Sequence, residues 1–286
     1  MKKVSSILII AVTFMLSCSV QNKKTVIIEE TSYKGTEHFK VSTSNATYYL
    51  EKQSGGFSGI LDTNGTDWIQ FRKSDSASVP GSADSDFRGL PNLVHGGEQS
   101  GVGHPGFDQC ISKKTNDSTI SVTSKSGKYA FDWIFSPESA ILIIQKADTM
   151  RNYWFLYEGP IAGKYNPATH MIFTNEGYHT EKPDIIKGDY IHGLFKWICL
   201  GDENYDQLLL LKHEIPDTLT DVIMYMGNSG AWDESGDGMV VAGFGRNPDH
   251  TLLMKTVPNT FSVRFIEKTG KTPGDIFSQI ESEGEK

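Results

Sequence analysis

The chain has 286 residues, with 27 lysines and arginines against 35 aspartates and glutamates, and a formal net charge of −8 at pH 7. This acidic balance excludes nucleic acid as the expected partner, because phosphate binding requires a basic surface. An anionic polysaccharide is not excluded, since a local basic cleft attracts anions at short range whatever the overall charge.

Residues 1–17 have the pattern of an export signal: two lysines, an apolar run and a small residue at the end. The apolar run is shorter than the about 20 residues that span a bilayer. Cys18 follows directly and resembles the lipidated cysteine of the bacterial lipobox. We therefore expect a lipid anchor at the outer membrane or cell surface, with secretion as the alternative. Residues 18–36 are expected to be a polar tether, and residues 37–286 a single domain.

Short apolar stretches then alternate with turn residues along the whole chain. Asn64-Gly65 and Ser126-Gly127 are hairpin signals. A helical apolar period appears only near the C-terminus, where the sequence TPGD predicts a helix over residues 273–281. Strands are expected in residues 38–53, 57–71, 119–137, 140–148, 153–157, 190–202, 206–214, 238–246 and 261–269.

This pattern predicts an all-β protein, a β-sandwich of jelly-roll type with one short C-terminal helix. The sequence shows no repeat of fixed period, which argues against a propeller or a solenoid. We expect a monomer. Cys110 follows a glycine-rich loop and Cys199 lies in an apolar strand, and we interpret both as buried thiols rather than as a disulfide.

Two segments do not fit the strand pattern, residues 73–109 and 157–190, and loops longer than about 15 residues usually have a function. In the second loop, Lys164 follows an aromatic strand and Gly163, so the strand end would position its ammonium group as a general base. The substrate-binding residues expected from the two loops are Arg88, Asn92, His95, His104, Tyr165 and His170.

Later strands add further candidates. In the strand that starts at Tyr190, alternation puts Tyr190, His192 and Lys196 on one face and mainly apolar residues on the other, which suits a solvated groove. Tyr190 and Tyr225 are candidate catalytic residues. His192, Lys196 and Arg264 are candidate substrate-binding residues.

The inventory of side chains favours one reaction. The chain has neither a GxSxG nucleophile elbow nor the carboxylate pattern typical of jelly-roll glucanases. Lysine, tyrosine, histidine, arginine and asparagine suit β-elimination from a uronic-acid polysaccharide, in which a cation offsets the carboxylate, one group removes the C5 proton and a tyrosine protonates the departing O4 oxygen. This reaction requires no cofactor, and no CxxC or His/Cys cluster indicates a metal site. A structural calcium ion is left open.

Several segments carry a resemblance to a known family: YYLEKQSGGFSGILDTNGTDWIQF, FRGLPNLVHGG with GHPGF, WFLYEGPIAGKY and GMVVAGFGR. They resemble jelly-roll polysaccharide lyases of marine Bacteroidetes, most closely the ulvan lyases of polysaccharide lyase family 28. The resemblance implies a lysine–tyrosine pair acting on sulfated rhamnose linked to glucuronic or iduronic acid. Lys164 matches the lysine, and Tyr225, Tyr190 and Tyr165 all qualify for the tyrosine. No tyrosine follows Tyr225, so a family pattern with a later tyrosine does not transfer.

Two other functions stay open. The same aromatic side chains would serve a non-catalytic carbohydrate-binding surface lipoprotein. A glycoside hydrolase with unrecognised carboxylates would give saturated products. In each case the expected partner is a polysaccharide, anionic if the chain is a lyase, and the membrane is contacted only through the lipid anchor.

Overall fold

The computed structural model describes residues 25–70, 90–91, 93, 110–179, 190–227, 238–249 and 251–284. Within them the chain forms three antiparallel sheets and one α-helix, so the predicted all-β sandwich with a short C-terminal helix is confirmed. No helix of this described part is long and apolar enough to cross a membrane. The predicted residues that lie outside the described residues are Cys18, Arg88, Asn92, His95 and His104.

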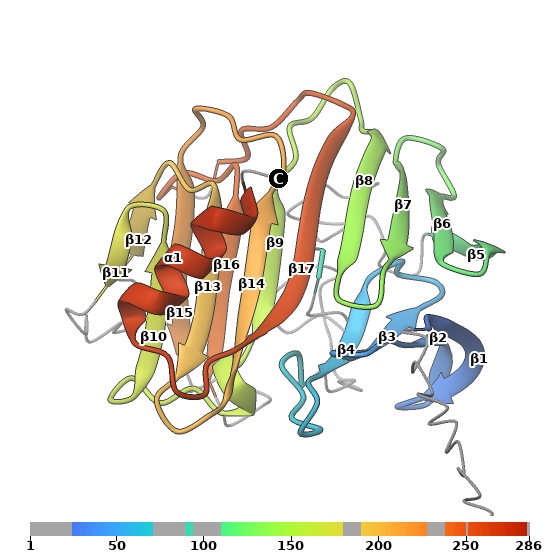
Figure 1. Ribbon diagram of the computed structural model, residues 1–286. Helices are drawn as coiled ribbons and strands as arrows, with labels where there is room; N and C mark the ends of the chain where they lie inside the picture. Colours follow the sequence, from blue (N-terminus) through green and yellow to red (C-terminus); the bar gives the residue numbers. More distant parts are fainter. Residues whose placement is uncertain are drawn as a thin grey trace, which may run out of the picture.

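Nine strands form the largest sheet, in the order β11-β10-β13-β14-β17-β8-β7-β6-β5 (Figure 1). Their bounds are β5 Cys110–Asn116, β6 Thr119–Ser124, β7 Ala130–Phe135, β8 Ala140–Lys146, β10 His170–Thr174, β11 Gly177–His179, β13 Trp197–Asp202, β14 Gln207–His213 and β17 Asn259–Glu267.

Two smaller sheets have four strands each, in the orders β1-β2-β3-β4 and β12-β15-β16-β9. Their bounds are β1 Ile27–Tyr33, β2 Thr36–Ser42, β3 Thr47–Glu51, β4 Phe57–Leu61, β9 Phe155–Gly159, β12 Tyr190–Gly193, β15 Asp221–Gly227 and β16 Met239–Phe244. A 3₁₀ turn, η1, spans Ile161–Gly163, and the helix α1 spans Pro273–Gly284.

Both smaller sheets pack against one face of the nine-stranded sheet, which we call its inner face. The β1–β4 sheet covers the β5–β8 end, where the rings of Phe57 and Trp133 lie 4.3 Å apart between centroids. The β12-β15-β16-β9 sheet covers the other end, where Phe155 stacks on Phe261 at 4.3 Å. Burial of such large aromatic side chains supplies much of the driving force for folding.

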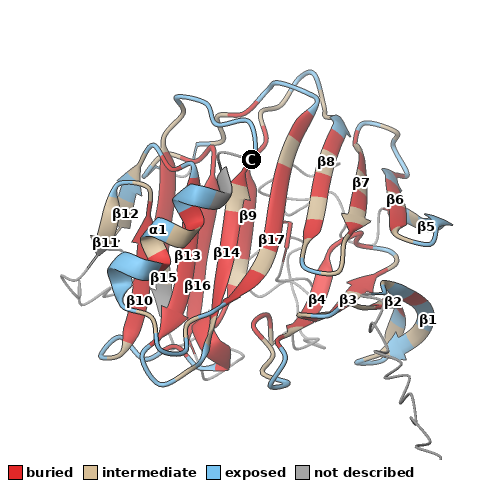
Figure 2. Ribbon diagram, in the orientation of Figure 1, coloured by how far each residue is buried: buried red, intermediate tan, exposed pale blue. Residues whose placement is uncertain are grey.

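The helix α1 lies across the outer face of the nine-stranded sheet, over β10, β13 and β14 (Figure 1). Ile276 and Ile280 of α1 belong to one buried cluster with Cys199 and Leu210 of the sheet. The sheet is therefore covered on both faces at this end. Figure 2 shows the result: β13 and β14 are buried along most of their length, whereas the edge strands β1 and β5 are mostly exposed.

Several segments that the sequence assigned to a tether or a loop form strands. β1 lies within the predicted tether, residues 18–36, and pairs with β2 along its length. The hairpin of β10 and β11 lies within the predicted loop, residues 157–190. All five residues of β10 are buried, His170 included, so this strand lacks the alternation of polar and apolar residues that identifies a strand in a sequence.

The predicted strand 190–202 is in fact two strands in different sheets, β12 and β13. The chain crosses between the sheets after Gly193, and the buried carboxylate of Asp221 holds this crossing by accepting hydrogen bonds from the N–H groups of Phe195 at 2.7 Å and Gly245 at 2.8 Å. Burial raises the pKa of Asp221 to about 8, although both N–H groups act in the opposite direction. Lys196 therefore does not share a strand face with Tyr190 and His192.

Cys110 begins β5 and Cys199 lies in β13. Both side chains are buried, and they belong to different hydrophobic clusters. The interpretation as two buried thiols is confirmed.

Two buried histidines are expected to make the free energy of unfolding depend on pH. His38 Nε2 lies 2.9 Å from Ser58 Oγ, and His213 Nε2 lies 2.8 Å from Asn259 Oδ1. Burial lowers the pKa of both imidazoles below the usual value. Below a pH of about 6.5 the unfolded chain therefore binds more protons than the folded chain, and these two groups reduce the free energy of unfolding as the pH falls.

Asp221 contributes the opposite slope, because its raised pKa makes the folded chain bind the extra proton below about pH 8. The informative measurement is therefore the difference between the wild type and a variant with His38→Gln and His213→Gln. We expect the wild type to lose more stability than this variant between about pH 7 and about pH 5, as followed by thermal melting. Parallel losses in the two proteins would contradict the assignment.

Candidate functional site

The two edge strands β12 and β9 bring polar side chains onto one face of the β12-β15-β16-β9 sheet. Tyr190, Met224, Val241 and Glu158 form a row across this sheet, because each is the direct cross-strand partner of the next. The adjacent row, which starts at Ile191, faces the core of the sandwich. The row of Tyr190 and Glu158 consequently lies on the face directed away from the nine-stranded sheet.

Trp154 packs with Met224 and Val241 of this face, and Arg246 stacks on Trp154. The guanidinium carbon of Arg246 is 4.5 Å from the ring centroid of Trp154, which is a cation–π contact. Arg246 is only 5% exposed and Trp154 is fully buried. Burial lowers the pKa of Arg246, whereas the negative charge of Glu158 raises it. Because an arginine stays protonated in proteins, this face holds a buried positive charge.

His192 lies on the same face, on the edge strand β12. It follows Tyr190 by two residues on β12, so both side chains point to one side of the sheet, and their ring centroids are 6.4 Å apart. His192 is exposed and Tyr190 is half-buried. We call this group the arginine site, and its members are Trp154, Glu158, Tyr190, His192 and Arg246. It combines a buried cation with two accessible side chains that can exchange protons.

The described part of the first predicted loop is anchored beside the arginine site. The carbonyl oxygen of Leu90 accepts a hydrogen bond from the Phe57 N–H at 2.8 Å, and that of Leu93 accepts one from the Trp154 N–H at 3.0 Å. Both leucines are buried. Leu93 therefore lies directly beside Trp154, the residue on which Arg246 is stacked, whereas Leu90 is tied to β4.

Tyr165, His170 and Tyr225 meet on the opposite, inner side of the same sheet. The hydroxyl of Tyr165 lies 3.3 Å from His170 Nδ1, and the ring centroids of Tyr165 and Tyr225 are 4.6 Å apart. Tyr165 and His170 are 4% and 3% exposed, and burial raises the pKa of Tyr165. The structure thus brings together three predicted site residues, as a largely buried cluster between the two sheets in which Tyr225 is half-buried.

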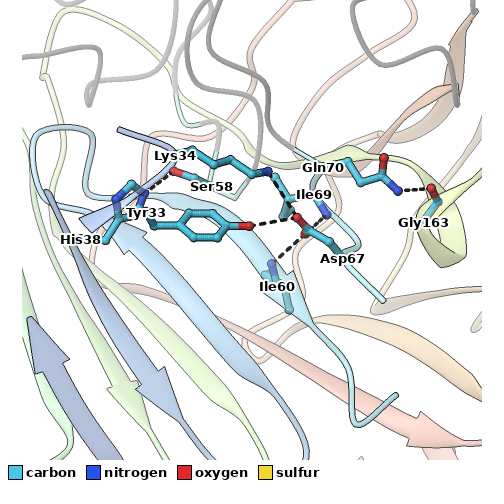
Figure 3. A network of polar contacts seen from close by, with 9 residues as sticks. All are labelled: Tyr33, Lys34, His38, Ser58, Ile60, Asp67, Ile69, Gln70 and Gly163. Atoms are coloured by element: carbon cyan, nitrogen blue, oxygen red, sulfur yellow. Dashed lines mark hydrogen bonds and ion pairs between the residues drawn. The ribbon is translucent and has the colours of Figure 1, made fainter. Parts of the chain in front are cut away.

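Lys164 follows a turn with unusual backbone geometry. Ala162 and Gly163 both have positive φ, 53° and 75°, and the Gln70 side-chain amide donates a hydrogen bond to the Gly163 carbonyl oxygen (Figure 3). Lys164 itself is extended, with φ −159°, so its exposed side chain and the buried side chain of Tyr165 point to opposite sides of the backbone. The side chain of Lys164 therefore points away from the ring contact between Tyr165 and Tyr225.

Asp67 anchors the segment that holds this turn. Its Oδ1 accepts hydrogen bonds from the N–H groups of Ile60 at 3.2 Å and Ile69 at 3.0 Å, and its Oδ2 accepts one from the Tyr33 hydroxyl at 3.3 Å (Figure 3). The neighbouring Gln70 then reaches the η1 turn. One carboxylate therefore connects the N-terminal strand β1 to the turn that precedes Lys164.

Gly163 is expected to be intolerant of a side chain. A Cβ atom there would lie 2.7 Å from Thr66 Cγ2, whereas a Cβ atom at Gly127, which has a similar φ of 71°, would meet nothing within 4 Å. We expect Gly127→Ala to reduce the free energy of unfolding by about 1–2 kcal/mol, the cost of the left-handed backbone. Gly163→Ala should cost clearly more. Denaturant unfolding of both variants tests this, and equal losses would contradict it.

Two predicted binding residues lie away from both groups. Arg264 is the cross-strand partner of Leu210, which is the partner of Cys199, so Arg264 lies on the outer face of the nine-stranded sheet. Lys196 is exposed in the crossing between β12 and β13. Neither residue belongs to the arginine site.

The sequence analysis missed three members of the arginine site. Trp154 and Glu158 belong to the stretch WFLYEG, where alternate positions share one face of β9, and this spacing was the available signal. Arg246 ends the segment GFGR after a buried strand. Its contact with Trp154 joins residues 92 positions apart, which no local pattern reveals. In the described ranges, no group of three His, Cys, Asp or Glu residues could hold a metal ion.

No protein-family model and no curated protein matches the chain. The solved structure of HI1317 aligns with a TM-score of 0.55 at 11% identity, over 85% of this chain and 100% of that one. YeaD of Salmonella typhimurium, a candidate mutarotase, aligns with a TM-score of 0.52 at 8% identity, over 84% and 94%. A Paenibacillus xanthan lyase reaches only 0.48 at 11% identity, over 92% and 26%, which is too weak to carry an argument. At these identities the likeness shows the β-sandwich fold alone.

Proposed function

We propose that the protein is a carbohydrate-active enzyme that cleaves a uronic-acid polysaccharide, with ulvan as the first candidate, by β-elimination at the arginine site. The observation that carries this proposal is the buried charge of Arg246 next to Tyr190, on the sheet face that also carries His192. Lipidation at Cys18 would hold the enzyme outside the cell, where such a polymer is met.

Each residue has a role that its position suits. Arg246 binds the uronate carboxylate and offsets the negative charge that develops when the C5 proton leaves. His192 accepts this proton, and Tyr190 donates one to the departing O4 oxygen. The C5–H and C4–O4 bonds break, a double bond forms between C4 and C5, and the product carries an unsaturated uronyl end.

A second candidate function rests on Glu158. Mutarotation of a free sugar requires a base at the anomeric hydroxyl and an acid at the ring oxygen. Glu158 and His192 lie on one face and could supply both, and the fold shared with the candidate mutarotase YeaD supports a sugar as the substrate. This reaction leaves every bond between sugar units intact, so the products separate the two functions.

The test is to incubate the mature protein with ulvan and other uronate polysaccharides and to follow the ultraviolet absorbance of new double bonds. In parallel, nuclear magnetic resonance follows anomer exchange of free glucuronate and glucose. Unsaturated products support the lyase. Faster anomer exchange without them supports the mutarotase. If neither occurs, both enzymatic proposals fail and a carbohydrate-binding protein remains.

Lys164 provides a direct test of where the chemistry occurs. Because its side chain is exposed and points away from Tyr165, we expect Lys164→Ala to keep turnover within about tenfold of the wild type, whereas loss of a general base typically costs about 10²- to 10⁴-fold. Lys164→Gln is the matched control for its length. A variant that folds but has lost all lyase activity would restore Lys164 as the base, as the family resemblance implies.

A further inference from the structure

A cavity of about 580 Å³ opens where β17 separates from β8. The pairing of these strands ends at Val263 and Ala140, but β17 continues to Glu267. Among the described strands, none pairs with the last residues of β17 on that side. Polar side chains from strands, turns and the helix α1 surround the gap, among them Asn45, Glu138 and Gln279.

Among the charged side chains that line this cavity, the two cations are more buried than the two acids. Arg264 and Lys271 line the cavity and are half-buried, whereas the two lining acids, Glu138 and Glu267, are exposed. Burial lowers the pKa of Arg264 despite the opposing charge of Glu214. Burial also means that the field of Arg264 is less screened by water than the fields of the exposed acids.

We propose that this cavity is a second sugar site, which binds a single sugar unit bearing one carboxylate through Arg264. A guanidinium matches a carboxylate through two parallel hydrogen bonds. The amide of Gln207 and the hydroxyl of Thr63 line the same space and suit sugar hydroxyls, whereas the Asn45 amide is engaged with Glu138 and Thr43. The volume lies within the roughly 300–1,000 Å³ typical of small-molecule sites.

The second sugar site is distinct from the arginine site. Arg264 lies on the outer face of the nine-stranded sheet, whereas Arg246 belongs to the smaller sheet that covers the inner face. The choice of a uronate as ligand rests on the proposed function, but the cavity and its charge do not.

The test is calorimetric titration of the mature protein with glucuronate and, as the neutral probe, with glucose. We expect binding of glucuronate that Arg264→Gln weakens at least about tenfold, the cost of one hydrogen bond to a charged group. Since Arg264 is half-buried, a second variant adds charge without removing a buried side chain. Thr63→Asp places a carboxylate in the cavity and should weaken glucuronate binding similarly, whereas Thr123→Asp, on the exposed side of β6, should leave it unchanged.

Glucuronate affinity that is the same in Thr63→Asp and Thr123→Asp would overturn the proposal, as would the absence of glucuronate binding in the wild type. Lyase activity is measured on the same proteins and separates this proposal from the proposed function. Glucuronate binding that Thr63→Asp weakens, in a protein that cleaves no polysaccharide, would refute the lyase and retain the second sugar site. If the protein cleaves the polysaccharide but Thr63→Asp does not change glucuronate binding, the lyase is supported and the second sugar site is refuted.

Discussion

Replacement of Tyr190 by phenylalanine should reduce turnover of a uronate polysaccharide by about 10²- to 10⁴-fold, because the departing O4 oxygen would lose its proton donor. The fold should persist, since the ring and its packing against the apolar residues of the sheet face are retained. The measurement is the initial rate of unsaturated product formation together with the melting temperature.

Tyr225→Phe is the matched control on the neighbouring strand. Tyr225 faces the inner side of the sheet, where its ring contacts Tyr165 at 4.6 Å between centroids. We expect this variant to keep turnover within about tenfold of the wild type. An inactive Tyr225→Phe beside an active Tyr190→Phe would instead assign the proton transfer to Tyr225.

Replacement of Arg246 by methionine should reduce kcat/KM by about 10²-fold or more. Removing one partner of a buried, hydrogen-bonded charge pair weakens binding by about 2–5 kcal/mol. Arg246→Lys should not rescue activity fully, because an ammonium keeps the charge but loses the planar stacking on Trp154 and the paired hydrogen bonds to a carboxylate. Steady-state kinetics on an acidic and a neutral oligosaccharide would show whether the loss is specific to the carboxylate.

Arg151→Met is the control for removal of a positive charge. Arg151 lies in the connection between β8 and β9, outside the arginine site, and is half-buried. We expect its kinetics to match the wild type. An equal loss of kcat/KM in Arg151→Met and Arg246→Met would show that overall charge, rather than the position of Arg246, determines activity.

The sequence predicted the fold well where strands are exposed on one side or bounded by turn residues. The Ser126-Gly127 turn between β6 and β7 is an example, because glycine supplies the positive φ of 71° that the turn requires. Strand prediction from the sequence failed where burial on both faces removed the alternation of polar and apolar residues. β10 is buried on both faces, and residues 194–196 continue the alternation of β12 toward β13, although the chain changes sheets there.

The site was predictable only in part, for a geometric reason. Tyr190 and His192 share a strand face, which period-two alternation identifies. Their neighbours Glu158 and Arg246 come from other strands, and the register that aligns Glu158 with Tyr190 through two intervening strands is set by tertiary pairing. Tyr225 and Tyr190, equal candidates by residue type, point to opposite faces because β12 and β15 pair Tyr190 with Met224 rather than with Tyr225.

The two buried thiols allow the rate of local unfolding to be measured at two places in the nine-stranded sheet. Cys199 is packed with Ile276 and Ile280 of α1, and burial raises its pKa, so the reactive thiolate forms only after the helix detaches. Cys110 lies in β5, at the far edge of the same sheet. A thiol reagent under native conditions would therefore modify each cysteine at the rate of a different local unfolding event. Mass spectrometry of the two labelled peptides would show which end of the sheet opens first.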